Sequence, residues 1–441
     1  MLRLQAYRFE LLPQAEQQRK MRQFAGSARS VFNRALALQN QEREKTGRKQ
    51  SGYAALCKML TTWRTDPPTA WLGQAPVHPL QQALRNLEAA WSRHFASLQK
   101  RKQGQIQPEE VVEAPKFKKK HRCRDSFRYP DPKQFRIEQN NNRLFLPKLG
   151  WLRYRNSRPI EGAPANVSVC RDGDKWFVSI QTEREVEKPV HQSSSMVGID
   201  LGVVRFATLS NREVIQPCNP LQKKQARLKR YQRMMARRVK FSKNWQKAKA
   251  KVNSTYRKIA HLRNDFLHQT TTAISQNHAI VVIEDLQVRK MSKSAAGTQE
   301  NPGSNVKQKS GLNRSILDQA WREWRRQLEY KQEWLGGRVL AVPPHHTSQE
   351  CPLCGHISPC NRRTQARFWC LSCGYTANAD DVSSINILSR GIEVLRDEGQ
   401  DTAQACAGWE TTARIACQVN GAVRPSAAGT LRGEALRCAA R

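Results

Sequence analysis

The first part of the chain changes from a strand-like to a helix-like hydrophobic pattern. Residues 1–12 place apolar side chains at roughly every second position, which predicts a β-strand that ends at Pro13. From Glu16 to about Arg43, and again from Pro79 to about Gln99, apolar residues recur at spacings of three and four, as on one face of a helix. We therefore expect a helical lobe over residues 13–114, after a single first strand.

Short alternating runs return later in the chain, separated by residues that favour turns. They predict a small antiparallel, barrel-like β unit over residues 115–185, which the strand at residues 1–12 completes. A polar stretch at residues 185–195 follows, and we expect a new domain to begin near Met196.

Beyond this boundary, acidic residues interrupt apolar segments at three places. Asp200 lies between two glycines in an apolar strand, Glu284 and Asp285 end a β-branched run, and Asp380 and Asp381 precede an apolar helical stretch. A carboxylate in a buried strand is costly unless it is paired or binds a metal. These residues are therefore candidate ligands, although strand ends and helix N-caps also use Asp and Glu structurally.

Converging carboxylates have a recognised chemistry. Phosphodiester hydrolysis by two metals needs several such ligands, and oxygen ligands of this type select Mg²⁺ or Mn²⁺. The pattern is thus consistent with a metal-dependent nuclease site, while leaving the structural interpretation open.

The net charge of the chain indicates which class of molecule it binds. Lysine and arginine number 75 against 37 acidic residues, giving a formal charge of +38, which indicates a polyanionic partner such as nucleic acid. An anionic membrane is the rival, but the most apolar runs are only a few residues long, far short of the ~20 that span a bilayer. No secretory signal pattern is visible, so we expect a cytoplasmic, nucleoid-associated protein without a membrane partner.

Two segments concentrate the positive charge. Residues 221–263 contain sixteen lysines and arginines and no acid, on a pattern that predicts a pair of basic helices. Residues 100–128 form a basic linker or phosphate-contacting loop, with a solvated loop as the alternative. The candidate nucleic-acid contacts are Lys116, Lys118, Lys119, Lys120, Lys229, Arg230, Arg237, Arg238 and Arg314.

Four cysteines have the spacing of a metal site. Cys351 and Cys354 form one close pair, and Cys370 and Cys373 form a second pair after fifteen intervening residues, which fits a tetrahedral, structural Zn²⁺ site. Four unligated thiols are the alternative. A closed site of this kind leaves no position for water, so the zinc is not the cutting metal.

Two further segments lack the pattern of a core. Residues 291–311 are rich in Ser, Gly, Asn and Lys and should be mobile, either as a lid over the acidic site or as a plain loop. The tail over residues 393–441 has weak apolar periodicity, and we expect it to be disordered or to order only on RNA.

Taken in order, GIDLG, VVIEDL, LNRSILDQAWREWRRQLEYK, CPLC, FWCLSCGY and NADDVSSINIL closely resemble the C-terminal half of TnpB, the OrfB-type protein of bacterial insertion sequences. The start MLRLQAYRFEL, the SARSVFNRAL helix and the PKFKKK segment resemble it more loosely. The resemblance implies an α+β multidomain chain: a wedge-like β unit with an inserted recognition lobe, then a RuvC, RNase H-like nuclease domain. That domain would span residues 196–345 and 376–392, with the zinc knuckle inserted at residues 346–375.

The same resemblance implies a function. TnpB is related to type V CRISPR effectors, in which a guide RNA reads the target and the protein checks a short flanking motif on double-stranded DNA. The family pattern assigns the catalytic, Mg²⁺-binding carboxylates to Asp200, Glu284 and Asp380, the last because an Asp precedes Asn-Ile by six residues. We expect a monomer. A cleavage-inactive RNA-guided regulator and a DNA transposase or accessory protein are the alternatives.

Overall fold

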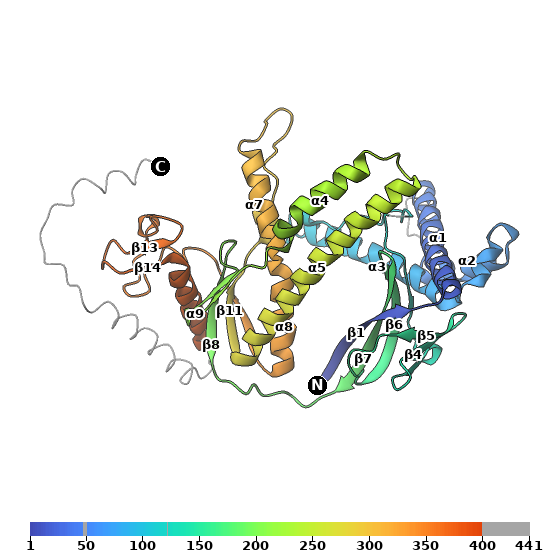
Figure 1. Cartoon of the computed structure of the whole chain (residues 1–441), viewed down its shortest axis with the longest axis horizontal. Helices are drawn as coiled ribbons and strands as arrows, with labels where there is room; N and C mark the ends of the chain where they lie inside the picture. Colours follow the sequence, from blue (N-terminus) through green and yellow to red (C-terminus); the bar gives the residue numbers. More distant parts are fainter. Residues whose placement is uncertain (47–50, 121, 399–441) are drawn as a thin grey trace, which may run out of the picture. The chain divides into compact units, whose positions relative to one another are not determined.

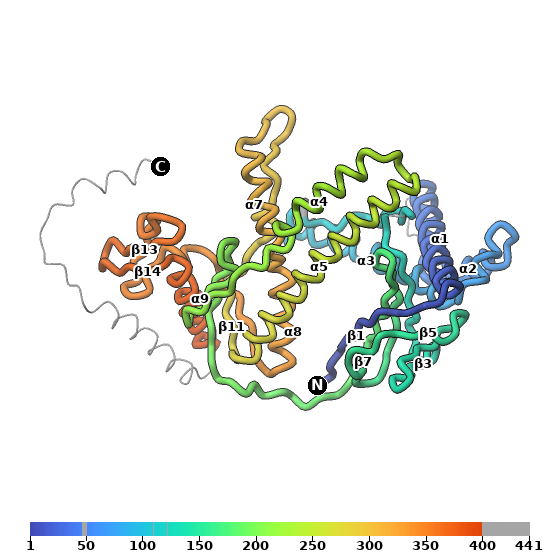
Figure 2. Tube along the Cα trace, viewed as in Figure 1, coloured from blue at the N-terminus to red at the C-terminus, as the bar shows by residue number. Residues whose placement is uncertain are grey.

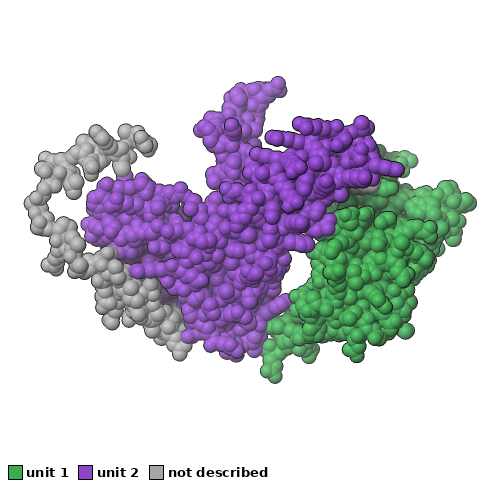
Figure 3. Space-filling model, in the orientation of Figure 1, with its two compact units in different colours: residues 1–187 green, residues 188–441 purple. Residues whose placement is uncertain are grey.

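The computed structural model describes residues 1–46, 51–120 and 122–398, and divides the chain into two compact units, Met1–Glu187 and Lys188–Arg441 (Figures 1 and 3). The division falls within the polar stretch expected to separate two domains. The finer domain boundaries given above remain predictions, and most of the predicted disordered tail, residues 399–441, lies outside the described residues.

The first unit combines a sheet with three α-helices on one hydrophobic core. The seven-stranded sheet has the order β2-β6-β7-β1-β5-β4-β3, and its strand pairs are antiparallel. The elements are β1 (Leu2–Leu12), α1 (Ala15–Thr46), α2 (Tyr53–Thr65), α3 (Val77–Lys102), β2 (Ser126–Tyr129), β3 (Arg136–Glu138), β4 (Arg143–Leu146), β5 (Gly150–Tyr154), β6 (Ala163–Asp172) and β7 (Lys175–Glu185).

The first strand lies inside this sheet although it is far in sequence from its neighbours. β1 pairs with β7 from Leu2 opposite Glu185 to Leu11 opposite Trp176, so the expected completion of the β unit is present. The alternate side chains of Tyr7, Phe9 and Leu11 are buried, as the two-residue period of a strand requires, whereas Leu2 and Leu4 at its start are exposed. Helix α2 was not predicted, although its buried Leu56, Leu60 and Trp63 follow helical spacing.

The second unit is built on a five-stranded sheet of order β10-β9-β8-β11-β12. Strands β8, β11 and β12 are parallel, whereas β9 runs antiparallel to both β8 and β10. Its elements are β8 (Met196–Leu201), β9 (Ala207–Leu209), β10 (Val214–Ile215), α4 (Pro220–Ala236), α5 (Lys243–Asn277), β11 (Ile280–Glu284), α6 (Val288–Met291), α7 (Val306–Gln319), α8 (Trp321–Leu335), β12 (Arg338–Val342), β13 (Arg367–Trp369), β14 (Thr376–Asn378) and α9 (Ala379–Asp397).

Helices cover both faces of this sheet. Val281 and Ile283 of β11 pack in one cluster with residues of α5 and α8, whereas Val282 packs in another with residues of α9. Because side chains alternate along a strand, odd-numbered positions of β11 face α5 and α8, and even-numbered positions face α9.

The predicted pair of basic helices is present as α4 and α5, which form a hairpin (Figure 2). One buried acid anchors it: Asp318 of α7 pairs with Arg263 of α5 and accepts a hydrogen bond from the Leu221 N–H at the start of α4.

Two predicted flexible segments are partly helical. Helix α7 begins at Val306, so residues 306–311 of the expected mobile loop are ordered as a helix, whose first backbone bond runs from the Lys309 N–H to the Asn305 carbonyl. Helix α9 continues to Asp397, into the predicted tail, because Leu395 continues the buried stripe that includes Ile392.

Candidate nuclease site and zinc knuckle

Two of the predicted carboxylates lie on adjacent parallel strands. Ile199 of β8 and Ile283 of β11 are partners in the register, so Asp200 and Glu284 follow at the same level. Both occupy positions that face α9, since Gly198 and Val282, two residues earlier in each strand, contact that helix. Their side chains therefore point to the same side of the sheet, at the edge where ligands of α/β proteins commonly bind.

The third carboxylate comes from the first turn of α9. The helix begins after Asn378, whose side chain accepts a hydrogen bond of 2.9 Å from the Asp380 N–H. Gly198 lets α9 approach β8, because a Cβ at this position would lie 2.3 Å from the Ser384 carbonyl oxygen and 2.6 Å from the Leu388 nitrogen. This close contact holds the start of α9 beside the strand that carries Asp200.

Burial raises the pKa values of both Asp200 and Glu284. Burial, followed by the charges of Glu284 and Asp380, raises the pKa of Asp200 from 3.8 to about 8, and the positive charge of Arg362 opposes this. Burial also raises the pKa of Glu284, against a hydrogen bond from Thr347. Such a cluster of mutually repelling carboxylates is stabilised by a bound divalent cation, and its oxygen donors suit Mg²⁺ or Mn²⁺.

The neighbouring acids have other partners. Asp285 follows Glu284 and so points to the opposite face of the sheet, where its carboxylate lies 2.6 Å from Arg325 of α8. Asp381 lies 3.9 Å from Arg205. The alternation of side chains along the strand thus identifies Glu284, and not Asp285, as the acid on the α9 side of the sheet, without reference to any family pattern.

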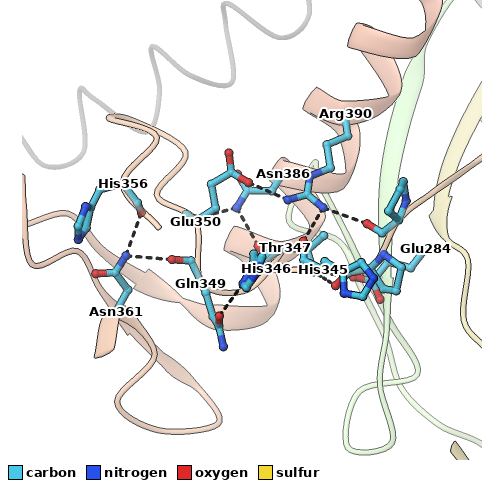
Figure 4. A network of polar contacts seen from close by, with 12 residues as sticks. Glu284, His345, His346, Thr347, Gln349, Glu350, His356, Asn361, Asn386 and Arg390 are labelled. Atoms are coloured by element: carbon cyan, nitrogen blue, oxygen red, sulfur yellow. Dashed lines mark hydrogen bonds and ion pairs between the residues drawn. The ribbon is translucent and has the colours of Figure 1, made fainter. Parts of the chain in front are cut away.

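Two residues near the acids were not singled out from the sequence as part of this site. The Thr347 hydroxyl donates a hydrogen bond of 2.6 Å to Glu284 Oε1 (Figure 4). Arg362, in the zinc-knuckle loop, lowers the pKa of both Asp200 and Glu284 through its charge. Neither residue could be found from local sequence spacing, because each lies far along the chain from the acids that it affects. Thr347, for example, is 63 residues from Glu284.

The four predicted zinc ligands come together. Their sulfur atoms lie within 4.8 Å of one another, with 3.6 Å between Cys351 and Cys373 and 3.5 Å between Cys354 and Cys370. A tetrahedral site with Zn–S bonds of ~2.3 Å places sulfur atoms roughly 3.8 Å apart, so the group fits zinc. In the described part of the chain, no other group of three or more His, Cys, Asp or Glu side chains gathers so tightly.

The two knuckles have the same local geometry. Gly355 and Gly374 adopt positive φ angles of 69° and 77°, and their N–H groups bond to the carbonyls of Cys351 and Cys370. A backbone N–H from His356 lowers the pKa of Cys354 to about 7, which favours the thiolate that a metal requires.

The chain is similar over most of its length to proteins named as RNA-guided DNA endonucleases. The chain is 52% identical over 395 residues to "Putative RNA-guided DNA endonuclease InsQ" of Escherichia coli (strain K12), covering 90% of this chain and 94% of the relative. The chain belongs to the TnpB family. A family model described as "Probable transposase" (OrfB_IS605) matches residues 179–295, and one described as "Cas12f1-like, TNB domain" matches residues 321–387.

Other similar proteins share less sequence identity with this chain. A "Putative RNA-guided DNA endonuclease" of Streptomyces pristinaespiralis is 32% identical, covering 88% of this chain and 89% of the relative. A solved structure described as "Structure of the mini-RNA-guided endonuclease CRISPR-Cas_phi3" aligns at 11% identity and a TM-score of 0.42, covering 88% of this chain and 92% of that one. A "Helix-turn-helix domain" model matches residues 1–48, where the structure has strand β1 and the single long helix α1.

The candidate nucleic-acid contacts of this TnpB-family chain fall into two groups. In the basic linker, Lys119 and Lys120 are exposed, but Lys116 pairs with Glu113 at 2.6 Å, and Lys118 lies over the Phe32 ring at 3.7 Å. Burial lowers the pKa of Lys118, and its backbone bonds to the Asn33 side chain, so Lys118 packs against α1. The remaining candidates are exposed on α4, α7 and the loop after α4, namely Lys229, Arg230, Arg237, Arg238 and Arg314.

No helix among the described residues has both the length and the apolar character needed to cross a membrane.

Proposed function

We propose that this protein is an RNA-guided DNA endonuclease of an insertion sequence that hydrolyses phosphodiester bonds at Asp200, Glu284 and Asp380. The observation that carries the proposal is the convergence of three carboxylates from β8, β11 and α9. Burial, followed by the charges of Glu284 and Asp380, raises the pKa of Asp200 to about 8. The names of the relatives support the guided reaction. The strand order, with one antiparallel strand beside three parallel ones, supports the RuvC, RNase H-like character of the domain.

The chain's own residues have separable roles in this reaction. Asp200, Glu284 and Asp380 would hold Mg²⁺ or Mn²⁺, which when bound supplies an activated water and stabilises the leaving oxygen. Arg362 places a positive charge beside the acids, where it can bind a phosphate of the strand to be cut. The four cysteines would hold a structural Zn²⁺ that folds the loop carrying Arg362.

The basic hairpin is the proposed contact for guide RNA or the guide–target duplex. Its connecting loop exposes Phe241, which is 62% exposed, and the ring of the half-buried Trp245 at the start of α5 lies 5.4 Å from the Phe241 ring. Lys240 and Lys249 lie over these rings. Aromatic faces beside lysines are typical of surfaces that stack unpaired bases.

We expect Phe241→Ala to weaken binding of the co-purified RNA by roughly 5- to 150-fold, because a base–aromatic stack contributes ~1–3 kcal/mol. This loss should change little with salt, since stacking releases no counterions, whereas Lys240→Ala should reduce the slope of log affinity against log salt. Filter-binding measurements between 50 and 300 mM KCl separate the two. Leu262→Ala, an exposed apolar residue on α5, is the matched control, and an equal effect there contradicts the stacking role.

The metal site also predicts a dependence of stability on pH. The folded chain binds the Asp200 proton more tightly than the unfolded chain does, since its pKa is raised from 3.8 to about 8. Without Mg²⁺, the free energy of unfolding should therefore fall as the pH rises between these values. Asp200→Asn, which mimics the protonated acid, should raise the midpoint of thermal unfolding at pH 7.5 by roughly 2–8 °C in Mg²⁺-free, zinc-containing buffer. Unchanged or lower stability of this variant would show that Asp200 is not under electrostatic stress.

The proposed function is tested by purifying the protein with its locus, sequencing the RNA that accompanies it, and offering plasmids that match this RNA in Mg²⁺. Cleavage at matching sites supports the guided nuclease. A discrete RNA with DNA bound but uncut favours the cleavage-inactive regulator. Strand transfer from a labelled transposon end by the protein alone favours the transposase.

A further inference from the structure

The segment Pro343–Glu350 connects the nuclease sheet to the zinc knuckle, and one of its residues contacts Glu284 of the acidic site (Figure 4). Thr347, near its middle, is 4% exposed and donates its hydroxyl to Glu284 Oε1 at 2.6 Å. One oxygen of Glu284 is therefore held, which restricts the rotation of its carboxylate and leaves Oε2 for another ligand. A hydrogen bond to an ionised acceptor is among the stronger side-chain contacts.

Helix α9 fixes the backbone of this segment. The buried Asn386 side chain donates to the carbonyls of Thr347 and Glu350, at 2.8 Å each. One turn later, Arg390 donates through Nη1 to the carbonyls of Pro343 and His345, at 2.9 and 2.7 Å, and through Nη2 to the Glu350 carboxylate at 2.8 Å. Since α9 also carries Asp380, a single helix sets the positions of that carboxylate and of the threonine that holds Glu284.

The zinc knuckle fixes the other end. Asn361 is fully buried and donates to the carbonyls of Gln349 and His356, at 2.9 and 3.0 Å, while its Oδ1 accepts the Leu371 N–H at 3.0 Å. Gln349 lies two residues before the first zinc cysteine, and Leu371 follows the third. The hydrogen bonds of one asparagine therefore link both knuckles to the segment that carries Thr347.

We propose that Thr347 is a positioning residue that presents Glu284 to the divalent metal, and that Asn386, Arg390 and the knuckle keep Thr347 in place. This inference deepens the proposed function. It depends on the proposed metal site, but it does not depend on RNA-guided cleavage. Partners that orient metal ligands typically change metal affinity 10- to 100-fold when they are lost. The knuckle then has a role at the nuclease site although its own zinc takes no part in the reaction.

The test measures Mn²⁺ binding to the full-length, zinc-loaded protein by electron paramagnetic resonance. Thr347→Val, which keeps the side-chain shape and removes the hydroxyl, should raise the Mn²⁺ dissociation constant about 10- to 100-fold. Thr347→Ser, which keeps the donor, should stay within about threefold of the natural protein. Thr271→Val, a change of another buried threonine in the same unit, is the matched control and should leave the dissociation constant unchanged.

A second variant keeps the inference testable if Thr347→Val does not fold. Arg390→Lys leaves Thr347 intact and keeps the positive charge that acts on Glu284, but it removes the guanidinium that holds the segment, and it should weaken Mn²⁺ binding roughly 3- to 30-fold at unchanged zinc content. Natural Mn²⁺ affinity in folded Thr347→Val, or in folded Arg390→Lys, would overturn the positioning role. If the natural protein binds Mn²⁺ through Asp200 but cuts no guided target, the proposed function fails and the positioning role stands.

Discussion

Asp200→Ala is expected to reduce Mg²⁺-dependent cleavage of a guide-matched plasmid by at least about 10³-fold. Metal ions stabilise charge in such transition states by several kcal/mol, and each ~1.4 kcal/mol is tenfold in rate. Asp200 is close enough to both other acids to be affected by them, since, after burial, the charges of Glu284 and Asp380 raise its pKa. Its loss should therefore remove a ligand that no neighbour can replace. Single-turnover cleavage with the co-purified RNA measures the effect.

The matched control is Asp285→Asn. Asp285 is adjacent to Glu284 in the sequence, but it faces the other side of the sheet and pairs with Arg325 on a partly exposed surface. Such pairs contribute at most about 1 kcal/mol, so this variant should cut at near the natural rate. RNA content should be unchanged in both variants. Cleavage that survives Asp200→Ala, or is lost equally in Asp285→Asn, contradicts the assignment of the site.

Cys370→Ser is expected to have the second largest effect. Cys370 is fully buried, and its sulfur lies 3.5 Å from that of Cys354, so the substitution removes one of the four proposed zinc ligands. Structural zinc contributes ~10–16 kcal/mol to the folding of small zinc modules. Without it the knuckle should unfold, and both Arg362 and the segment carrying Thr347 would lose their support. We expect cleavage to fall at least about 10²-fold, with zinc content below one ion per chain.

RNA binding should persist in Cys370→Ser, because the basic hairpin is anchored by Asp318 and Arg263 rather than by the knuckle. Cys218→Ser replaces a free, half-buried cysteine of the same unit and is the matched control for loss of a thiol. Zinc content by mass spectrometry and single-turnover cleavage are measured on the same preparations. Full cleavage by zinc-free Cys370→Ser would show that the knuckle has no influence on the acidic site.

Features encoded by local spacing could be read from the sequence. The cysteine pairs predict a zinc site because each pair lies within one tight turn, and the structure brings their four sulfur atoms within 4.8 Å. The first strand and the basic helices follow from periodicities of two and three to four, and all are present. The roles of the three carboxylates were inferred through a family resemblance, and their catalytic function remains a prediction.

Other features depend on contacts between distant segments. Helix α7 begins inside a stretch whose composition indicated a loop, and α9 outlasts its expected end because Ile392 and Leu395 pack against the sheet. Composition describes what a segment prefers alone, whereas packing against a partner decides whether it is ordered.

The sequence by itself determined the ligand types, the zinc spacing and the charge that indicates nucleic acid. Only the tertiary structure decided which acids face one another, since Gly198 lets α9 close on β8 and strand alternation turns Glu284 toward it and Asp285 away. The same holds for Thr347 and Arg362, whose relation to the acids exists only in the folded chain. The physical reason is that a ligand pair within one turn is set by a few backbone angles, whereas a site assembled from separate elements is set by the packing of the whole core.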